Sequence, residues 1–489
     1  MALKILKWTA TSLLAIVLVI YVARAFGSRQ MPDIGPEYRI EFEHEFDASQ
    51  EGVTDWSDYV ALERRQADEL SEKILAATRP DSLVDRFSPG SVTNPDNYDG
   101  NWNHSYEMRA ASPRGVAVLL HGLTDSPYTM RSTAEALVAA GYNVVAPRMP
   151  GHGFAVGGML QARWEDWAAA VRIAVRHAMQ QPGADQSLLL VGYSNGGLIA
   201  IDYALRCEQY EGLACPDKLV LMSPSIAVSP LAAITNLHSA VSWIPFFEKF
   251  QWQSILPEVD PFKFTSFPKR AAWEIYKLQG RTHKKLAQPD EIAKLPPILT
   301  FQSAVDNTVS APAIVRLLYD RLPENGSKLL VYDINSSSTL LTLMKSKPVN
   351  PAAYFQSMVP LKFGVTVLRN RDSHSRAIDT MTLLAGEREA IIERTSLEWP
   401  KGIFSLSHIA LPFRADDVVY GDGSGLLPDD HRVAFGALAP RGERNVMRLN
   451  SDYFLRMRYN PFFDFQQSFM IEWLGESQHD STSGRHAED

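Results

Sequence analysis

The sequence predicts an α/β protein with a doubly wound, mostly parallel sheet. The first observation is a series of short apolar runs, among them residues 116–120, 142–146 and 187–191, in which polar and apolar side chains do not alternate. Such strands are buried on both faces, as strands of parallel sheets are. The second observation is that segments with helical spacing separate these runs, as right-handed crossovers require. The third is a Ser within a Gly-rich bend directly after the run 187–191.

The first 26 residues are expected to form a signal anchor. Lys4 and Lys7 precede an uncharged apolar run over residues 8–22, the pattern of an export signal. This run is slightly short for a full membrane span, and residues 23–25 resemble the small-x-small site of signal peptidase. We expect one uncleaved membrane segment with the catalytic body on the extracytoplasmic side. A secreted or periplasmic protein, formed by cleavage, is the alternative.

The rest of the chain divides by composition and periodicity. Residues 27–110 are expected to be a tether and an N-terminal helix, and residues 111–474 a catalytic domain. Within that domain, the aromatic-rich residues 226–295 are predicted to be a helical cap inserted after the strand 219–222. Residues 336–401 form a further insertion, to which the sequence assigns no role. The polar residues 475–489 are expected to be a disordered tail.

Composition excludes several classes of function. Hydrophobic residues make up 45% and charged residues 21% of the chain, which is ordinary globular usage. The net charge of -8 argues against nucleic-acid binding. No metal-type Cys and His spacing occurs, and the acidic stretch 416–430 does not match a calcium loop, so no metal site is expected. Cys207 and Cys215 either form a disulfide in an oxidising compartment or remain free thiols.

The strongest catalytic signal is Gly192-Tyr193-Ser194-Asn195-Gly196. It follows a buried strand and precedes a helix, so the Ser194 hydroxyl is expected to project from a tight strand-to-helix turn above the sheet. The flanking glycines are needed because a larger side chain would collide with neighbouring elements. Ser194 is therefore predicted to be a nucleophile.

A second signal, His121-Gly122-Leu123-Thr124, directly follows the first buried strand. Acyl transfer creates an alkoxide that donors fixed in advance must stabilise. The backbone amides of Leu123 and Asn195 are predicted to be these oxyanion-hole donors. His121 itself is expected to have a structural role.

These motifs together resemble bacterial monoacylglycerol lipases and carboxylesterases of the α/β-hydrolase superfamily. The resemblance covers about residues 115–309. It is carried by His121-Gly122-Leu123-Thr124-Asp125-Ser126-Pro127, Pro147-Arg148-Met149-Pro150-Gly151-His152-Gly153, Trp164-Glu165-Asp166-Trp167 and Gly192-Tyr193-Ser194-Asn195-Gly196-Gly197. It implies the α/β-hydrolase fold and a Ser, Asp or Glu, His triad in that chain order.

The acid and the base are then sought after the nucleophile. Asp306 follows the apolar run 298–302 and looks like the family's acid loop, whereas the competitor Asp333 lies within a strand-like run. His408 is the predicted base, delivered by an apolar strand that begins near residue 402. Its rival is His374, which also follows a strand-like run.

The expected activity is hydrolysis of carboxylic esters through an acyl-enzyme, without a cofactor. The aromatic cap favours an apolar acyl chain or a lipid ester as substrate, because an aromatic pocket gains from burying hydrocarbon. An aminopeptidase or amidase of the same fold is one alternative. A non-catalytic scaffold of the cell envelope is the other.

Overall fold

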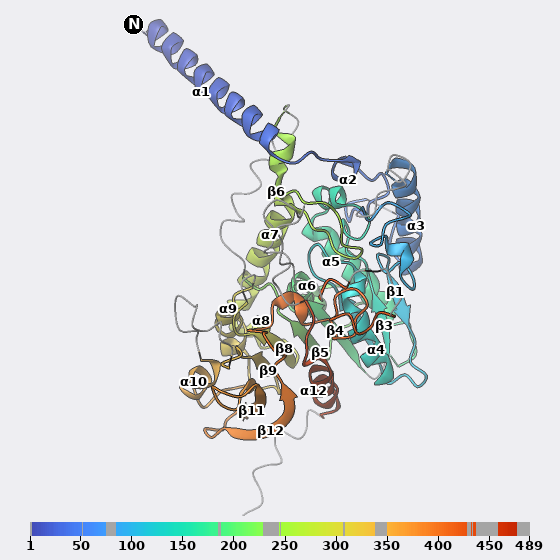
Figure 1. Ribbon diagram of the computed structural model, residues 1–489, viewed down its shortest axis with the longest axis vertical. Coiled ribbons are helices and arrows are strands. Elements are labelled where there is room, and N and C mark those ends of the chain that lie inside the picture. The colour runs from blue at the N-terminus through green and yellow to red at the C-terminus, as the bar shows by residue number, and fades with distance from the viewer. Residues whose placement is uncertain are drawn as a thin grey trace, which may run out of the picture.

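A computed structural model describes residues 2–50, 52–74, 85–183, 187–227, 244, 246–306, 309–337, 350–427, 432, 434–436 and 458–476. Figure 1 shows an α/β body from which one long helix projects. The helices are α1 (Ala2–Gln30), α2 (Pro36–Arg39), α3 (Trp56–Lys73), α4 (Arg131–Ala139), α5 (Trp164–Ala178), α6 (Asn195–Ala204), α7 (Lys269–Leu286), α8 (Pro289–Ile292), α9 (Ala311–Leu317), α10 (Pro351–Gln356) and α12 (Phe463–Gly475).

One large sheet of ten strands organises the described part of the chain. Its order is β1-β3-β2-β4-β5-β8-β9-β10-β11-β12. The strands are β1 (Tyr106–Met108), β2 (Gly115–Leu120), β3 (Tyr142–Ala146), β4 (Leu188–Tyr193), β5 (Lys218–Met222), β8 (Ile298–Ser303), β9 (Lys328–Tyr332), β10 (Gly364–Asn370), β11 (Ala377–Leu383) and β12 (Ile391–Glu398). Neighbouring strands from β3 to β10 are parallel, while β1 pairs antiparallel with β3 and β11 pairs antiparallel with both β10 and β12. The predicted fold class is confirmed.

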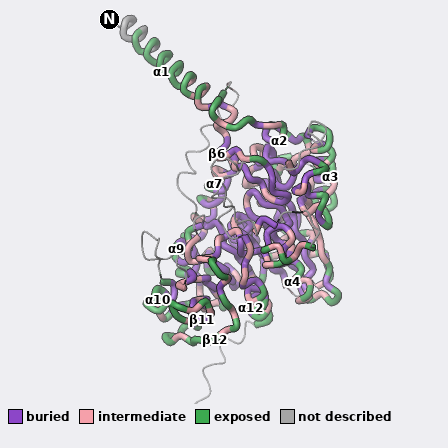
Figure 2. Tube along the Cα trace, in the orientation of Figure 1, coloured by how far each residue is buried: buried purple, intermediate pink, exposed green. Residues whose placement is uncertain are grey.

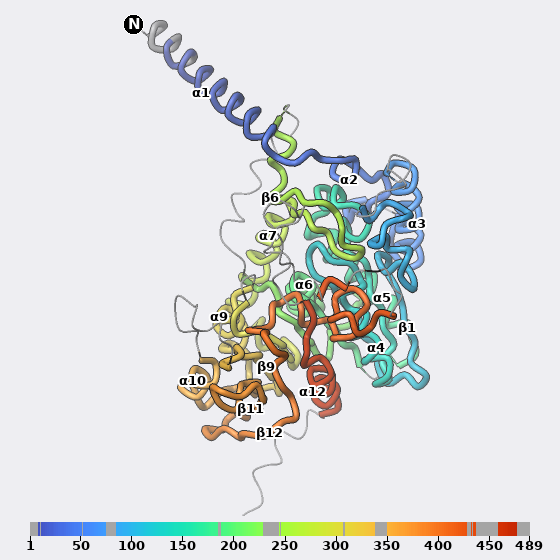
Figure 3. Tube along the Cα trace, viewed as in Figure 1, coloured from blue at the N-terminus to red at the C-terminus, as the bar shows by residue number. Residues whose placement is uncertain are grey.

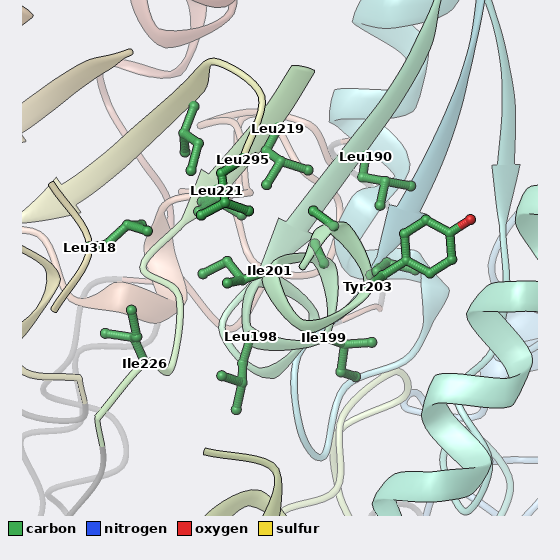
Figure 4. Close-up of a cluster of buried hydrophobic side chains, with 14 of the residues drawn as sticks. Leu190, Leu198, Ile199, Ile201, Tyr203, Leu219, Leu221, Ile226, Leu295 and Leu318 are labelled. Atoms are coloured by element: carbon green, nitrogen blue, oxygen red, sulfur yellow. The ribbon is translucent and has the colours of Figure 1, made fainter. Parts of the chain in front are cut away.

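The core lies on both faces of the sheet, as the unbroken apolar strands require. On β2, Val116, Val118 and Leu120 join the cluster formed with α3, α5, α6 and α9. Ala117 and Leu119, which point to the other face, join the cluster formed with α4 and α12. Figure 2 shows buried residues throughout the centre of the body, and Figure 4 shows leucines and isoleucines of β4, β5 and α6 packed together. Each such side chain contributes about 1.5–3 kcal/mol on burial.

The predicted cap occupies the chain between β5 and β8. Its described part contains a two-stranded sheet of β6 (Trp252–Ser254) and β7 (Phe267–Pro268), followed by α7 and α8. Residues 228–243 and 245 of the predicted cap lie outside the described residues. On α7, Ile275, Leu278 and Leu286 join the core cluster that includes α6.

The segment 336–401 extends the sheet. After residues 338–349, which lie outside the described part, α10 leads into β10, β11 and β12. β10 continues the parallel order next to β9, and β12 forms an exposed edge. The segment for which the sequence assigned no role therefore supplies strands that lie between β9 and the predicted base His408.

The segment expected to be a tether also packs on the body. Ile34, Tyr38 and Phe42 are buried. Farther along, the buried guanidinium of Arg148 lies 3.5 Å from Glu45 and 3.3 Å from Glu63. These ion pairs fasten the N-terminal segment to the loop that follows β3. The tail is predicted to begin at residue 475, but Gly475 is the last residue of α12, and residues 477–489 lie outside the described residues.

Cys207 and Cys215, for which the sequence left two states open, form a disulfide. Their Cα atoms are 5.1 Å apart, within the usual range for such a bond. The disulfide closes the loop between α6 and β5.

Candidate active site

Ser194 occupies the sharp turn between β4 and α6. β4 ends at Tyr193 and α6 begins at Asn195, so one residue makes the whole connection. Ser194 has φ 52° and ψ -113°, a conformation that residues with a side chain rarely adopt. Its backbone N–H donates to Met222 O at 2.9 Å, which fixes the turn to β5. Its side chain is only partly buried. The strain is stored at the residue predicted to be the nucleophile.

The neighbouring glycines are required by close backbone approaches. A Cβ placed on Gly192 would lie 2.5 Å from Gly196 O, and one on Gly196 would collide with Leu120 O. Since both obstacles are backbone atoms, a side chain at either position would displace the turn or β2. The local sequence therefore makes the turn possible.

The structure brings Asp306 and His408 together. The nearest carboxylate oxygen of Asp306 is 3.8 Å from Nδ1 of His408. The Asp306 side chain is fully buried. It accepts hydrogen bonds from Val309 N at 3.0 Å and from Gln302 Nε2 at 3.3 Å. Two hydrogen bonds thus orient the carboxylate, and its Oδ1 is the oxygen nearest the imidazole.

His408 lies beside the nucleophile turn. Its ring is stacked at 19° on that of Tyr193, with centroids 6.1 Å apart, and Tyr193 directly precedes Ser194. The apolar strand expected to deliver His408 does not form: the preceding residues are extended without a ladder, and His408 begins a 3-10 turn (His408–Ala410). The reason is that carbonyl groups of this segment accept isolated hydrogen bonds from Asn335 and Ser303, which do not form a continuous ladder.

Three hydrogen bonds attach the segment before His408 to the central sheet, after the chain has passed through β10, β11 and β12. Asn335 N donates to Phe404 O at 2.7 Å, and Asn335 Nδ2 donates to Ile403 O at 2.7 Å. Ser303 Oγ, at the end of β8, donates to Leu406 O at 2.7 Å. Through these bonds His408 comes to the same sheet edge as Ser194 and Asp306.

The rival residues are placed differently. His374 is exposed in the turn between β10 and β11, where its backbone N–H donates to Asp372 at 2.8 Å. Asp333 directly follows β9, and its backbone N–H donates to Leu368 O of β10 at 3.0 Å. Burial raises the pKa of Asp333 to about 6. The ion-pair geometry thus joins Asp306 with His408 and neither of the rivals.

The predicted oxyanion-hole residues flank the turn. Asn195 is the first residue of α6, and Leu123 lies in the loop after β2. Thr124, next to Leu123, has φ 64°, and its carbonyl accepts from Phe264 N of the cap at 2.7 Å. The Asn195 side chain is buried, and neither its Nδ2 nor its Oδ1 has a hydrogen-bond partner in the described part of the chain.

His121 holds the loop after β2, as expected. Its Nδ1 donates to Gly122 O at 2.9 Å, and its Nε2 accepts from Met149 N at 2.9 Å. Because a backbone N–H can only donate, the ring must be neutral and protonated at Nδ1. Burial lowers its pKa well below the ordinary value, which favours this state.

Sequence reasoning missed a charged network between the cap and the loop after β2. Lys263 Nζ lies 2.5 Å from Asp125 Oδ1, and Asp125 is buried. Nearby, the buried Asp260 accepts from Tyr420 OH at 2.6 Å and pairs with Arg458 at 3.1 Å. Asp125 stands within the quoted motif, but its partner is 138 residues away, so no local signal revealed the pair.

In the acidic stretch 416–430, of which residues 428–430 lie outside the described residues, Asp417 binds both its own loop and Tyr128. The carboxylate of Asp417 accepts from Tyr128 OH at 2.9 Å and from the backbone N–H groups of Val419 and Tyr420 at 2.9 and 2.8 Å. Among the described residues, no group of three or more His, Cys, Asp or Glu side chains is arranged to hold a metal ion.

Several described aromatic residues of the cap are buried against the body, while Phe246 and Tyr276 are exposed. Phe262 stacks on Tyr128 with ring centroids 4.1 Å apart, and Trp252 and Phe264 are buried. Trp243 lies outside the described residues. These buried rings form part of the protein core, so the lipid preference inferred from them in the sequence needs other support.

Part of the chain is similar to known hydrolases. Residues 111–334 match the family described as serine aminopeptidase, S33 (Hydrolase_4). A thermostable monoacylglycerol lipase from Bacillus sp. (strain H-257) is 28% identical over 197 residues, which cover 40% of this chain and 72% of that protein.

Two solved structures are similar over a comparable part of the chain. One belongs to the metagenome-derived lipolytic enzymes LipS and LipT, with a TM-score of 0.37, 21% identity, and coverage of 47% of this chain and 87% of that chain. The other is the monoacylglycerol lipase of Paleococcus ferrophilus, with a TM-score of 0.35 and 21% identity. The match covers 47% of this chain and 89% of that chain.

Proposed function

We propose that this chain, an α/β-hydrolase that resembles monoacylglycerol lipases, hydrolyses carboxylic esters through an acyl-enzyme on Ser194. The observation that carries the proposal is the pairing of His408 with the buried Asp306, at the sheet edge where Ser194 occupies a strained turn. A nucleophile, a base and an orienting carboxylate in this chain order are what the fold uses for acyl transfer.

In the proposed reaction, Ser194 Oγ attacks the ester carbonyl carbon while His408 takes the hydroxyl proton. Asp306 stabilises the imidazolium, and the amides of Leu123 and Asn195 stabilise the alkoxide. The imidazolium then gives its proton to the leaving alcohol as the carbon–oxygen ester bond breaks. Water, deprotonated by His408, attacks the acyl-enzyme and releases the carboxylic acid and the free serine.

The nucleophile is tested with Ser194→Ala and nitrophenyl esters of graded acyl length. We expect kcat to fall by roughly 10⁶-fold, because removal of the nucleophile ends covalent catalysis. Labelling of the wild type, and not of the variant, by a fluorophosphonate provides a second readout. Turnover that stays at the wild-type level in the variant would remove the serine mechanism.

The base is tested by a matched pair of variants. His408→Ala is expected to lower kcat by at least roughly 10⁴-fold, whereas His374→Ala, at an exposed turn, is expected to leave kcat within about twofold. The opposite pattern would assign the base to His374. Comparable losses in Asp306→Asn and none in Asp333→Asn would complete the assignment.

We infer that the natural substrate is a monoacyl lipid ester. The support is the relative named as a monoacylglycerol lipase, together with the apolar helix α1, which would hold the enzyme near such amphiphiles. Comparing kcat/KM for glycerol esters of short and long acyl chains tests this. The family described as serine aminopeptidase includes the amide alternative, and amino-acid nitroanilides cleaved faster than esters would favour it.

We infer further that α1 anchors the protein in a membrane with the body on the extracytoplasmic side. Residues Thr11–Gln30 are long and apolar enough to cross a bilayer, and the disulfide suits an oxidising compartment. Membranes extracted at alkaline pH should retain the full chain, and an external protease should digest the body in intact spheroplasts. Release by alkali would instead indicate a cleaved signal or a peripheral protein.

A further inference from the structure

The end of α1 lies against a short segment of the cap. This segment, residues 246–250, includes the start of a 3-10 turn (Glu248–Gln251) that leads into β6. In Figures 1 and 3 it lies at the point where α1 meets the body, while β12 lies at the opposite end of the molecule. We call the last turns of α1, from Tyr21, and residues 246–250 the collar.

Aromatic rings and cations make the contact. Tyr21 meets Phe246 and Phe247 with ring centroids 6.1 and 6.4 Å apart. The guanidinium of Arg24 lies over the ring of Phe250 at 4.3 Å, and that of Arg29 lies over Phe246 at 5.9 Å. Gly27 admits the ring of Phe250, because a Cβ there would be 3.3 Å from it.

Lysines fix the cap segment from both sides. Lys249 Nζ donates to Met31 O at 3.2 Å and pairs with Asp33 at 2.9 Å. Lys269 Nζ, at the start of α7, donates to Phe250 O at 2.8 Å. The position of the segment on α1 is therefore set by charged contacts as well as by ring packing.

The uncharged part of α1 is shorter than the hydrocarbon core of a bilayer, so the candidate span Thr11–Gln30 includes Arg24 and Arg29. Residues 8–23 carry no charge, and at 1.5 Å per residue they span about 24 Å, against about 30 Å of hydrocarbon in a typical bilayer. Arg24 follows this run, at the level where Phe250 covers its guanidinium. The cap phenylalanines thus add apolar surface where the helix loses it, and Phe26 and Phe246 remain exposed at 67% and 37%.

The charge of the collar is opposite to that of the whole chain. Arg24, Arg29 and Lys249 stand in it against Glu248 alone, whereas the protein carries a net charge of -8. Glu248 pairs with Arg39 at 2.5 Å. Aromatic rings mixed with cations are the composition of a membrane–water interface, where cations attract anionic headgroups.

We propose that the collar is a membrane-docking surface that completes the hydrophobic belt of α1 and holds the cap at the headgroup level of an anionic bilayer. The proposal rests on the anchoring stated under the proposed function. Its consequence is that the cap faces the lipid leaflet, so an ester dissolved in the bilayer meets the cap before the aqueous phase.

The test places an environment-sensitive label in the full chain, reconstituted in vesicles of phosphatidylcholine with phosphatidylglycerol. Both native cysteines are held in the disulfide, so Phe246→Cys provides a single reactive thiol. Leu384→Cys is the matched control, because Leu384 is 45% exposed beside β11, far from α1. We expect blue-shifted emission and quenching by spin-labelled lipid at position 246 and neither at position 384. Equal, water-like emission at both positions would overturn the proposal.

The charge contribution is tested with Arg24→Gln/Arg29→Gln. Turnover of a long-chain ester embedded in anionic vesicles should fall several-fold, at roughly fivefold for each cation that contacts anionic lipid, and turnover of a soluble nitrophenyl ester should stay unchanged. If the variant hydrolyses the vesicle-embedded ester as fast as the wild type does, the proposal is contradicted. Alkaline extraction separates the two inferences: retained protein with an unquenched label refutes the collar alone, and released protein refutes the anchor.

Discussion

Replacing Lys263 with Met should destabilise the protein strongly, because it leaves the Asp125 carboxylate buried without its cation. The ammonium lies 2.5 Å from Asp125 Oδ1, and the aspartate is only 4% exposed. Burial raises the pKa of Asp125, and Lys263 opposes this by favouring the charged form. Breaking a buried pair on one side typically costs about 3–5 kcal/mol, a large share of the total of roughly 5–15 kcal/mol for a folded protein.

Two matched variants separate charge from packing. Asp125→Asn removes the carboxylate while Lys263, whose side chain is 19% exposed, can reach water, so its cost should be about 1–2 kcal/mol. In Lys263→Met/Asp125→Asn neither charge of this pair remains, so the double variant should recover much of the loss, and a coupling of about 2 kcal/mol is expected. Urea unfolding followed by Trp fluorescence measures all four proteins.

The cost of Lys263→Met should depend on pH in a defined direction. Without Lys263, the folded-state pKa of Asp125 should lie still higher above the ordinary value of 3.8, so the folded state holds the proton more tightly than the unfolded state. Stability then falls as pH rises through that window, and the cost of Lys263→Met should shrink as the pH is lowered toward 4. A cost below about 1 kcal/mol at pH 8, or one independent of pH, would refute the reasoning.

Four further outcomes follow from local features of the structure. Gly196→Ala should lower the free energy of unfolding by about 1–3 kcal/mol and abolish most turnover, because the added Cβ would collide with Leu120 O. Gly280→Ala in α7 is the control, because no atom lies near the added Cβ, and it should raise the free energy of unfolding by about 0.5–1 kcal/mol in the same urea assay. Burial lowers the pKa of His104 to about 4 from 6.5, so the free energy of unfolding falls as the pH drops through this range. His104→Phe should therefore reduce the difference in unfolding free energy between pH 8 and pH 4 by about 3 kcal/mol. An unchanged difference would contradict this. Reducing Cys207–Cys215 should cost about 2–3 kcal/mol in unfolding free energy, and no loss on reduction would refute that.

The nucleophile turn shows what short-range sequence can predict. β3 covers the predicted residues 142–146, and β4 runs two residues beyond the predicted end, to Tyr193, directly before Ser194. The turn depends on Gly192 and Gly196, which are within two residues of Ser194. Because nearby residues specify the strand, the turn and the helix, the sequence motif was sufficient to predict the turn and its position.

The partner of Asp306 shows what short-range sequence cannot predict. His374 and His408 both follow apolar runs, and the choice between them depends on how the chain returns after β12. Ser303 and Asn335 make that return by hydrogen bonds to residues that are 103 and 68 positions away along the chain. The path of β10, β11 and β12 therefore decides which imidazole reaches the carboxylate.

By itself, the sequence determined the parallel α/β fold, the nucleophile turn with its two glycines, and the apolar first helix, because each depends on side chains within a few residues of one another. Only the tertiary structure decided that His408 pairs with Asp306, that Lys263 neutralises Asp125, and that the cap packs on the end of α1. The physical reason is that a buried charge or an exposed ring can be paired with any complementary group along the chain, and packing selects one.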